Sequence, residues 1–154
     1  MKLYVVGPLF TEAEQKQRLY EGKKLREFFA EKNREVQIDN PIEFPLNGKT
    51  NVTAAEIYTL DYKRLSEADI VFFDLSNSDS GSCVALGLIM EKKIQGKDIK
   101  VYPVIGDLRL ARNGQGGYES SLGFNSMMIG ILTGNNIPIY PNFEEAFEAF
   151  TREF

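Results

Sequence analysis

The amino-acid sequence predicts an α/β fold with a mostly parallel sheet flanked by helices. Short runs of β-branched and aromatic residues alternate along the chain with longer helical patterns, as in folds built from strand–helix–strand units. The 154 residues correspond to about one domain, and 43% of them are apolar, enough to form a core. The sequence shows no internal repeat, low-complexity tract or linker. We therefore expect residues 1–154 to form a single domain.

Five segments have the composition of strands. The clearest is residues 70–75 (IVFFDL), a continuous apolar run of the kind found in a central strand covered on both faces. The first strand spans residues 3–6 and ends at Gly7-Pro8. The remaining predicted strands are residues 35–38, 99–105 and 137–140. Five strands with intervening helices favour a flavodoxin-like or Rossmann-like sheet.

Two capping boxes mark helix starts between these strands. Thr11 is followed three residues later by Glu14, and Thr53 by Glu56, the spacing that pairs a cap hydroxyl with a returning carboxylate. The predicted helices are residues 11–32, 53–66, 83–94, 124–132 and a last amphipathic helix from residue 142. The expected inner stripe of the first helix is Leu19, Leu25, Phe28 and Phe29.

The segments that follow predicted strands are the places to search for a site. In an open α/β sheet, ligands bind beyond the carboxyl ends of the strands. These segments are residues 7–10, 39–52, 74–82 and 106–125. Residues 39–52 are rich in Pro, Asn and Gly and form too long a connection for a minimal turn, which favours a functional loop.

The composition excludes several classes of chemistry. Eighteen Lys and Arg against 22 Asp and Glu give a net charge of −4, which argues against a nucleic-acid or anionic-membrane binder. The single cysteine, Cys83, excludes an internal disulfide framework. The absence of His excludes Ser–His and Cys–His pairs, His-ligated zinc and an imidazole base. Acid–base or nucleophilic chemistry would therefore fall to carboxylates, Tyr or Lys.

The sequence also lacks the signals of a membrane segment, a metal site or a common cofactor motif. Its apolar runs are far shorter than the roughly 20 residues that span a bilayer, and the run before Gly7 is too short for a signal peptide. It contains no dinucleotide-binding G-x-G-x-x-G after the first strand and no Walker A sequence. We expect a soluble cytoplasmic protein with no metal and no cofactor.

Three features could carry chemistry, and each has a structural explanation as well. Residues 79–82 (DSGS) open a helix after the central strand, where backbone N–H groups bind hydroxyls or anions, but Asp79 also suits an N-cap. Asp61 lies inside a predicted helix, facing either a pocket or solvent. Its neighbours on a face expected to be mostly buried are Ile57, Tyr58, Leu60 and Leu65. Tyr4 suits core packing with a satisfied hydroxyl.

Taken together, these features resemble the nucleoside 2-deoxyribosyltransferases. The resemblance rests on residues 4–11 (YVVGPLFT), on Asp61 placed eight residues before Asp69, on residues 79–87 (DSGSCVALG) and on Asn125. Their order and spacing span most of the chain. The resemblance implies a flavodoxin-like fold and the transfer of 2-deoxyribose between nucleobases, through a covalent deoxyribosyl-enzyme and with retention. It further implies a role in nucleotide salvage, deoxynucleoside and free nucleobase as substrates, no cofactor, and a homo-oligomer, commonly a hexamer.

The resemblance also implies roles for individual residues. Asp61 would act in proton transfer or in positioning the base, Asp79 would hold the deoxyribose hydroxyls, and the hydroxyl of Tyr4 would orient the nucleophile. Asn125 would reach the sugar 5′-hydroxyl in a neighbouring subunit, and Phe154 would contribute its terminal carboxylate. The implied substrate contacts are Gly7, Leu9, Phe10, Phe44, Gly81, Ser82, Asn125, Met127 and Phe154. The candidates to face the base from the second segment are Asn40, Glu43 and Phe44.

One residue departs from the family pattern at the centre of the mechanism. Ala85 stands where the family has its nucleophilic Glu, and a methyl group cannot attack an anomeric carbon. Cys83 points roughly 200° around the helix from that position, and Glu91 lies more than a turn further along the axis. We therefore expect the chain as written to be nearly inactive, because removing a covalent nucleophile costs many orders of magnitude in rate.

Two explanations of Ala85 compete. One is an engineered replacement of the nucleophile, and the other is a natural family member that has lost catalysis and binds nucleosides as a sensor or partner. The presence of every other site residue favours the engineered variant.

Three further functions are weighed against the transferase. A deoxynucleoside 5′-monophosphate N-hydrolase would need Ser or Arg groups for the phosphate, and residues 7–11 offer no Arg. A nucleoside-binding regulatory module would keep the pocket without the reaction. A flavodoxin-like domain with no nucleoside role would not be stabilised by deoxynucleosides.

Overall fold

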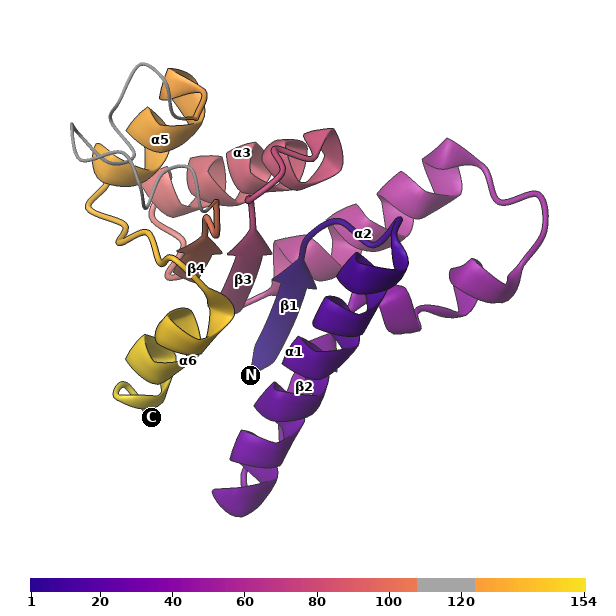
Figure 1. Ribbon diagram of the computed structural model, residues 1–154, viewed down its shortest axis with the longest axis horizontal. Coiled ribbons are helices and arrows are strands. Elements are labelled where there is room, and N and C mark those ends of the chain that lie inside the picture. The colour runs from indigo at the N-terminus through magenta and orange to yellow at the C-terminus, as the bar shows by residue number, and fades with distance from the viewer. Residues whose placement is uncertain (108–123) are drawn as a thin grey trace.

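The computed structural model describes residues 1–107 and 124–154 (Figure 1). Within them, four parallel strands form one sheet in the order β2-β1-β3-β4. The strands are β1 (Lys2–Val6), β2 (Gln37–Asp39), β3 (Ile70–Asp74) and β4 (Lys100–Val104). The helices are α1 (Glu12–Glu31), α2 (Ala54–Glu67), α3 (Ser80–Ile94), α5 (Ser126–Thr133) and α6 (Phe143–Thr151), with 3-10 turns η1 (Pro41–Glu43) and η2 (Pro45–Gly48). The predicted parallel α/β fold is confirmed.

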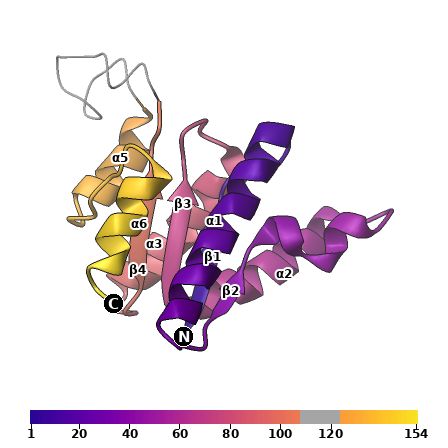
Figure 2. The ribbon, with the colours of Figure 1, turned by 60° about the horizontal axis from the view of Figure 1, so that its bottom comes forward.

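Alternating side chains of the strands divide the core into two layers. Leu3 and Val5 of β1 face one side of the sheet, where they pack in a cluster with residues of α1 and α6. Tyr4 and Val6 face the other side, in a cluster with residues of α2, α3 and α5. Figure 2 shows α1 and α6 in front of the sheet and α3 behind it. The sheet is thus covered on both faces, as its apolar strands require.

The register brings the carboxyl ends of the strands to one edge. Val6 of β1 pairs with Phe73 of β3, and Asp74 at the end of β3 pairs with Val104 of β4. The turn after β1 therefore lies beside the turn that leads from β3 into α3. This is the edge at which parallel α/β sheets bind ligands.

The expected fifth strand is absent from the described sheet. Residues 137–140 contribute an isolated bridge between Val104 and Tyr140, in which the Tyr140 amide donates to the Pro103 carbonyl at 2.9 Å. Pro138 interrupts this segment and Pro141 follows it. Because proline has no amide hydrogen to donate, the ladder does not extend beyond the bridge.

The helix starts follow their caps. Both predicted capping boxes are present, at Thr11 with Glu14 and at Thr53 with Glu56. Helix α3 begins three residues before the predicted residue 83, because Asp79 caps it.

The inner stripe predicted for α1 is only partly right. Leu25 and Phe29 are buried, but Leu19 is 47% exposed. The helix buries Arg18 and Glu21 in its place, because the Arg18 guanidinium reaches the end of β3, where it donates to Asp74 Oδ2 at 2.9 Å.

Arg18 lies directly behind the turn after β1 and bonds to the end of β3. It is 1% exposed, and its Nη2 also donates to Glu21 Oε1 at 2.6 Å, while burial raises the pKa of Glu21 to about 7. A Cβ added to Gly7 would lie 1.5 Å from Arg18 Nη1. Glycine at position 7 therefore lets the turn lie directly against the guanidinium.

Across the two described ranges, the structure holds no helix with both the length and the apolar character needed to cross a membrane.

Candidate functional site

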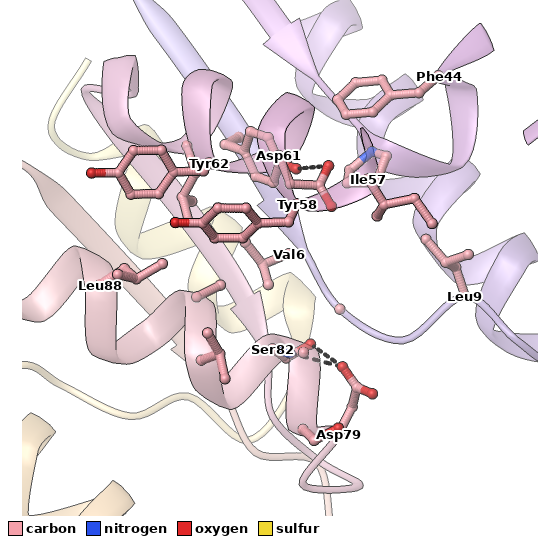
Figure 3. A pocket seen from close by; sticks show the side chains of 18 of the residues that line it. Val6, Leu9, Phe44, Ile57, Tyr58, Asp61, Tyr62, Asp79, Ser82 and Leu88 are labelled. Atoms are coloured by element: carbon pink, nitrogen blue, oxygen red, sulfur yellow. Dashed lines mark hydrogen bonds between the residues drawn. The ribbon is translucent and has the colours of Figure 1, made fainter. Parts of the chain in front are cut away.

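A cavity of about 550 Å³ opens at the carboxyl end of β1, between α2 and α3 (Figure 3). Its volume lies in the range of small-molecule sites. Its walls come from the turn after β1, from η1 and η2, from α2 and from the start of α3. The lining residues are Tyr4, Val6, Gly7, Leu9, Phe10, Pro41, Phe44, Leu46, Asn47, Ala54, Ile57, Tyr58, Asp61, Tyr62, Leu65, Asp79, Ser80, Gly81, Ser82, Val84, Ala85 and Leu88.

Tyr4 and Asp61 form a hydrogen-bonded pair in this cavity. Tyr4 faces α2 because its position in β1 alternates with Leu3 and Val5, and its hydroxyl donates to Asp61 Oδ1 at 2.9 Å. Burial raises the pKa of Asp61, partly offset by the Tyr4 hydrogen bond and by Arg64. Burial and the neighbouring Asp61 charge raise the pKa of Tyr4. Tyr4 therefore remains a donor, and Asp61 holds its proton more tightly than a carboxyl group in water does.

Asp79 caps α3 and lines the cavity at the same time. Its Oδ2 accepts the Ser82 amide at 2.8 Å and the Ser82 hydroxyl at 2.9 Å. Its Oδ1 has no hydrogen-bond partner in residues 1–107 or 124–154. The N-cap explanation is confirmed, and it leaves one carboxylate oxygen available to a hydroxyl donor.

Ala85 lies on the cavity wall of α3, one turn after Ser82. Cys83 is directed elsewhere, with its Sγ 3.7 Å from Met128 Sδ in α5. Glu91 accepts a hydrogen bond from Gln95 and does not line the cavity. Within the described part of the chain, no carboxylate on α3 takes the place of the side chain missing at position 85.

Aromatic rings form much of the remaining wall. Phe44 meets Tyr4 edge to face, with ring centroids 6.2 Å apart, and the Arg64 guanidinium carbon lies 4.8 Å from the Phe44 centroid while Arg64 pairs with Asp39. Tyr58 and Tyr62 stack with centroids 5.5 Å apart.

The face of α2 that carries Asp61 was misjudged from the sequence. Ile57 and Tyr58, expected on a mostly buried face, are 47% and 58% exposed, and they line the cavity. Tyr62 also lines the cavity, and it was not predicted from the sequence. Its spacing of four residues from Tyr58, next to Asp61, is the signal that could have found it, since residues three and four apart share one helix face.

Most of the candidate site residues lie in this cavity. They are Tyr4, Gly7, Leu9, Phe10, Phe44, Asp61, Asp79, Gly81, Ser82 and Ala85. Asp69, the other half of the predicted spacing, lies at the opposite end of the sheet, where its carboxylate accepts the Lys2 amide at 2.8 Å.

Five other candidates lie outside the cavity of their own chain. Asn125 caps α5 by accepting the Met127 amide at 3.0 Å, and Phe154 packs on Phe150 with centroids 4.8 Å apart, on the opposite face of the sheet. Met127, Asn40 and Glu43 do not line the cavity either. Asn40 donates to the Arg18 carbonyl at 2.7 Å, and Glu43 pairs with Arg26. Their contacts with a substrate remain predictions.

Residues 1–107 and 124–154 contain no group of three or more Cys, Asp or Glu side chains able to hold a metal ion.

Comparison with known proteins places the fold. No family model matches the sequence. An uncharacterised protein of Ureaplasma parvum serovar 3 is 29% identical over 121 residues, which cover 73% of this chain and 75% of that protein. A conserved protein of Enterococcus faecalis V583 superposes over 100% of this chain and 99% of its own, with a TM-score of 0.76 and 19% identity.

The solved structure of an enzyme has a similar architecture. A 2-deoxyribosyltransferase from Leishmania mexicana matches 98% of this chain and 97% of its own, with a TM-score of 0.64 and 19% identity. The chain is therefore an α/β protein with a deoxyribosyltransferase-like fold. At this level of identity, the likeness establishes the fold and leaves the activity to be argued from the site.

Proposed function

We propose that the cavity is a 2′-deoxynucleoside site, and that the chain is a nucleoside 2-deoxyribosyltransferase with Ala85 at the position of the nucleophile. The observation that carries this proposal is the convergence of three elements on one cavity. Strand β1 and helix α2 supply the Tyr4–Asp61 pair, and α3 supplies Asp79 and Ala85.

The residues present suit the demands of N-glycosidic chemistry. The apolar and aromatic walls suit a flat nucleobase, and the Asp79 oxygen that has no partner among the described residues suits a sugar hydroxyl. A nucleobase leaves more readily when it is protonated, and the raised pKa of Asp61 suits a general acid for that step.

Ala85 stops the reaction at its first covalent step. In a retaining transfer, a carboxylate oxygen bonds to C1′ as the C1′–N bond breaks, and a second base later reverses this exchange. The methyl group of Ala85 has no electron pair to form that bond. The chain as written then binds a deoxynucleoside without turning it over.

The proposal is tested by restoring the carboxylate. We expect Ala85→Glu to transfer deoxyribose from 2′-deoxyinosine to adenine, measured by chromatography. The unsubstituted chain and Ala85→Gln, which matches the Glu side chain in size without its charge, should be silent. Turnover by the unsubstituted chain that disappears on substitution of Asp61 would contradict the role assigned to position 85.

The second candidate is a binding module that keeps the pocket and lacks the reaction, and Ala85 is the observation that favours it. Deoxynucleoside binding in both forms, with no transfer by Ala85→Glu, would select this candidate. A 5′-monophosphate N-hydrolase fits the cavity less well, because its described lining contains no Lys or Arg to neutralise a phosphate. Tighter binding of 2′-deoxyadenosine 5′-monophosphate than of 2′-deoxyadenosine would reverse that order.

The proposal includes a cytoplasmic role in nucleotide salvage and an assembly of identical chains. Asn125 does not line the cavity of its own chain, and the proposed contact with substrate would come from a second subunit. Sedimentation of the full chain, together with the effect of Asn125→Ala on nucleoside affinity, tests this part.

A further inference from the structure

The described lining of the cavity carries negatively charged side chains and no positively charged ones. The charged residues in its described lining are Asp61 and Asp79, and Lys and Arg are absent from that lining. The whole sequence contains no His. A neutral deoxynucleoside would bring no positive charge to either carboxylate.

Cations lie behind several of the lining residues, and Arg18, directly behind Gly7, pairs with Glu21 and Asp74. Arg64 pairs with Asp39 and lies against the ring of Phe44, while Lys92 Nζ lies 5.0 Å from the centroid of Tyr62. Arg64 lowers the pKa of Asp61, but burial raises it by more. The negative charge of Asp61 is therefore only partly compensated by the protein.

One oxygen of Asp61 is open to the cavity. Oδ1 accepts the Tyr4 hydroxyl, whereas Oδ2 has no hydrogen-bond partner in the part of the chain that the structure describes. Figure 3 shows the carboxylate on the cavity side of α2, close to Ile57 and Tyr58. A cationic group of a ligand can approach this oxygen without displacing a protein donor.

The aromatic walls favour the same kind of ligand. The rings that line the cavity belong to Tyr4, Phe10, Phe44, Tyr58 and Tyr62. The faces of such rings are electron-rich and attract cations, as the position of Lys92 over Tyr62 already shows. A flat, positively charged ring would meet both the aromatic faces and the open carboxylate.

Building on the proposed function, we infer that the site prefers 2′-deoxynucleosides whose base carries a positive charge, such as N-methylated purines, over those with a neutral base. Asp61 supplies the main part of this preference in its ionised form, since a base that already carries a positive charge needs no proton from it. Asp79, which caps α3, is left for the sugar.

The test compares two isomeric ligands that differ in charge at neutral pH. 1-Methyl-2′-deoxyadenosine is a cation, and N6-methyl-2′-deoxyadenosine carries the same methyl group on a neutral base. Calorimetric titration of the full chain should give about tenfold tighter binding of the cation, which corresponds to about 1.4 kcal/mol. In Asp61→Asn, which keeps an acceptor for Tyr4, the ratio of the two affinities should fall to near one.

A matched variant separates a local effect from net charge. Glu148→Gln removes one negative charge from the exposed face of α6 and should keep the tenfold ratio. Equal affinities for the two isomers in the unsubstituted chain would overturn the inference and leave the proposed function standing. A ratio that persists in Asp61→Asn would overturn the assignment to Asp61. If neither isomer nor 2′-deoxyadenosine binds, the proposed function fails as well.

Discussion

At the scale of the residue, neutralising the Asp61 carboxylate would cost the fold little stability. Burial raises its pKa, so the folded state holds its proton more tightly than the unfolded chain does. The resulting contribution to stability is present at low pH and is lost as the pH rises through the raised folded pKa. The need of the proposed site for a proton donor explains why an ionisable group occupies position 61.

This sign gives a prediction for Asp61→Asn. At neutral pH the variant should unfold at a higher temperature than the unsubstituted chain, because it removes a partly desolvated charge and keeps an acceptor for the Tyr4 hydroxyl. The difference should shrink at pH values below the ordinary carboxyl pKa of about 4, where Asp61 is protonated in both states. Thermal unfolding followed by circular dichroism across this range tests it. A variant that is less stable at neutral pH and equally stable in acid would contradict the assigned direction.

At the scale of the element, the turn after β1 packs directly against the buried Arg18 side chain of α1. A methyl group at Gly7 would lie 1.5 Å from Arg18 Nη1 and 3.0 Å from Asp74 Cβ, and Arg18 has no exposed space into which to retreat. Gly7→Ala should therefore cost roughly 1–3 kcal/mol, the usual range for overpacking. It should also weaken nucleoside binding, because Gly7, Leu9 and Phe10 line the cavity.

The matched control for this prediction is Gly87→Ala. Position 87 lies within α3, and an added Cβ there meets nothing within 4 Å. Alanine should raise the stability slightly, by up to about 1 kcal/mol, because it favours a helix over glycine. Denaturant unfolding of the two variants compares them directly. Equal stability of Gly7→Ala and the unsubstituted chain would show that the close packing of Gly7 on Arg18 does not constrain the turn.

At the scale of the whole molecule, local patterns predicted the layers of the fold better than its edges. The apolar run at residues 70–75 and the cap at Thr11 depend on neighbouring residues and were read correctly. The prediction of a fifth strand was wrong because it followed the periodicity of residues 137–140 and gave too little weight to Pro138.

The errors on helix faces have a different origin. Leu19 and Tyr58 are apolar at helical spacing, but that spacing cannot distinguish a core from a cavity wall or an exposed surface. The burial of Arg18 depends on Asp74, 56 residues away, and that distance hides the pairing from any local pattern. The cavity residues within 4–10 and 79–85 were predicted from a resemblance in order and spacing. Local patterns alone would not have brought these two segments together.

The most direct test of a nucleoside site is calorimetric titration of the unsubstituted chain with 2′-deoxyinosine, followed by thermal unfolding with the ligand in excess. The account predicts saturable one-site binding and, at 100 times Kd, a stabilisation of about 2.7 kcal/mol. An absence of both heat and stabilisation at millimolar 2′-deoxyinosine would contradict it.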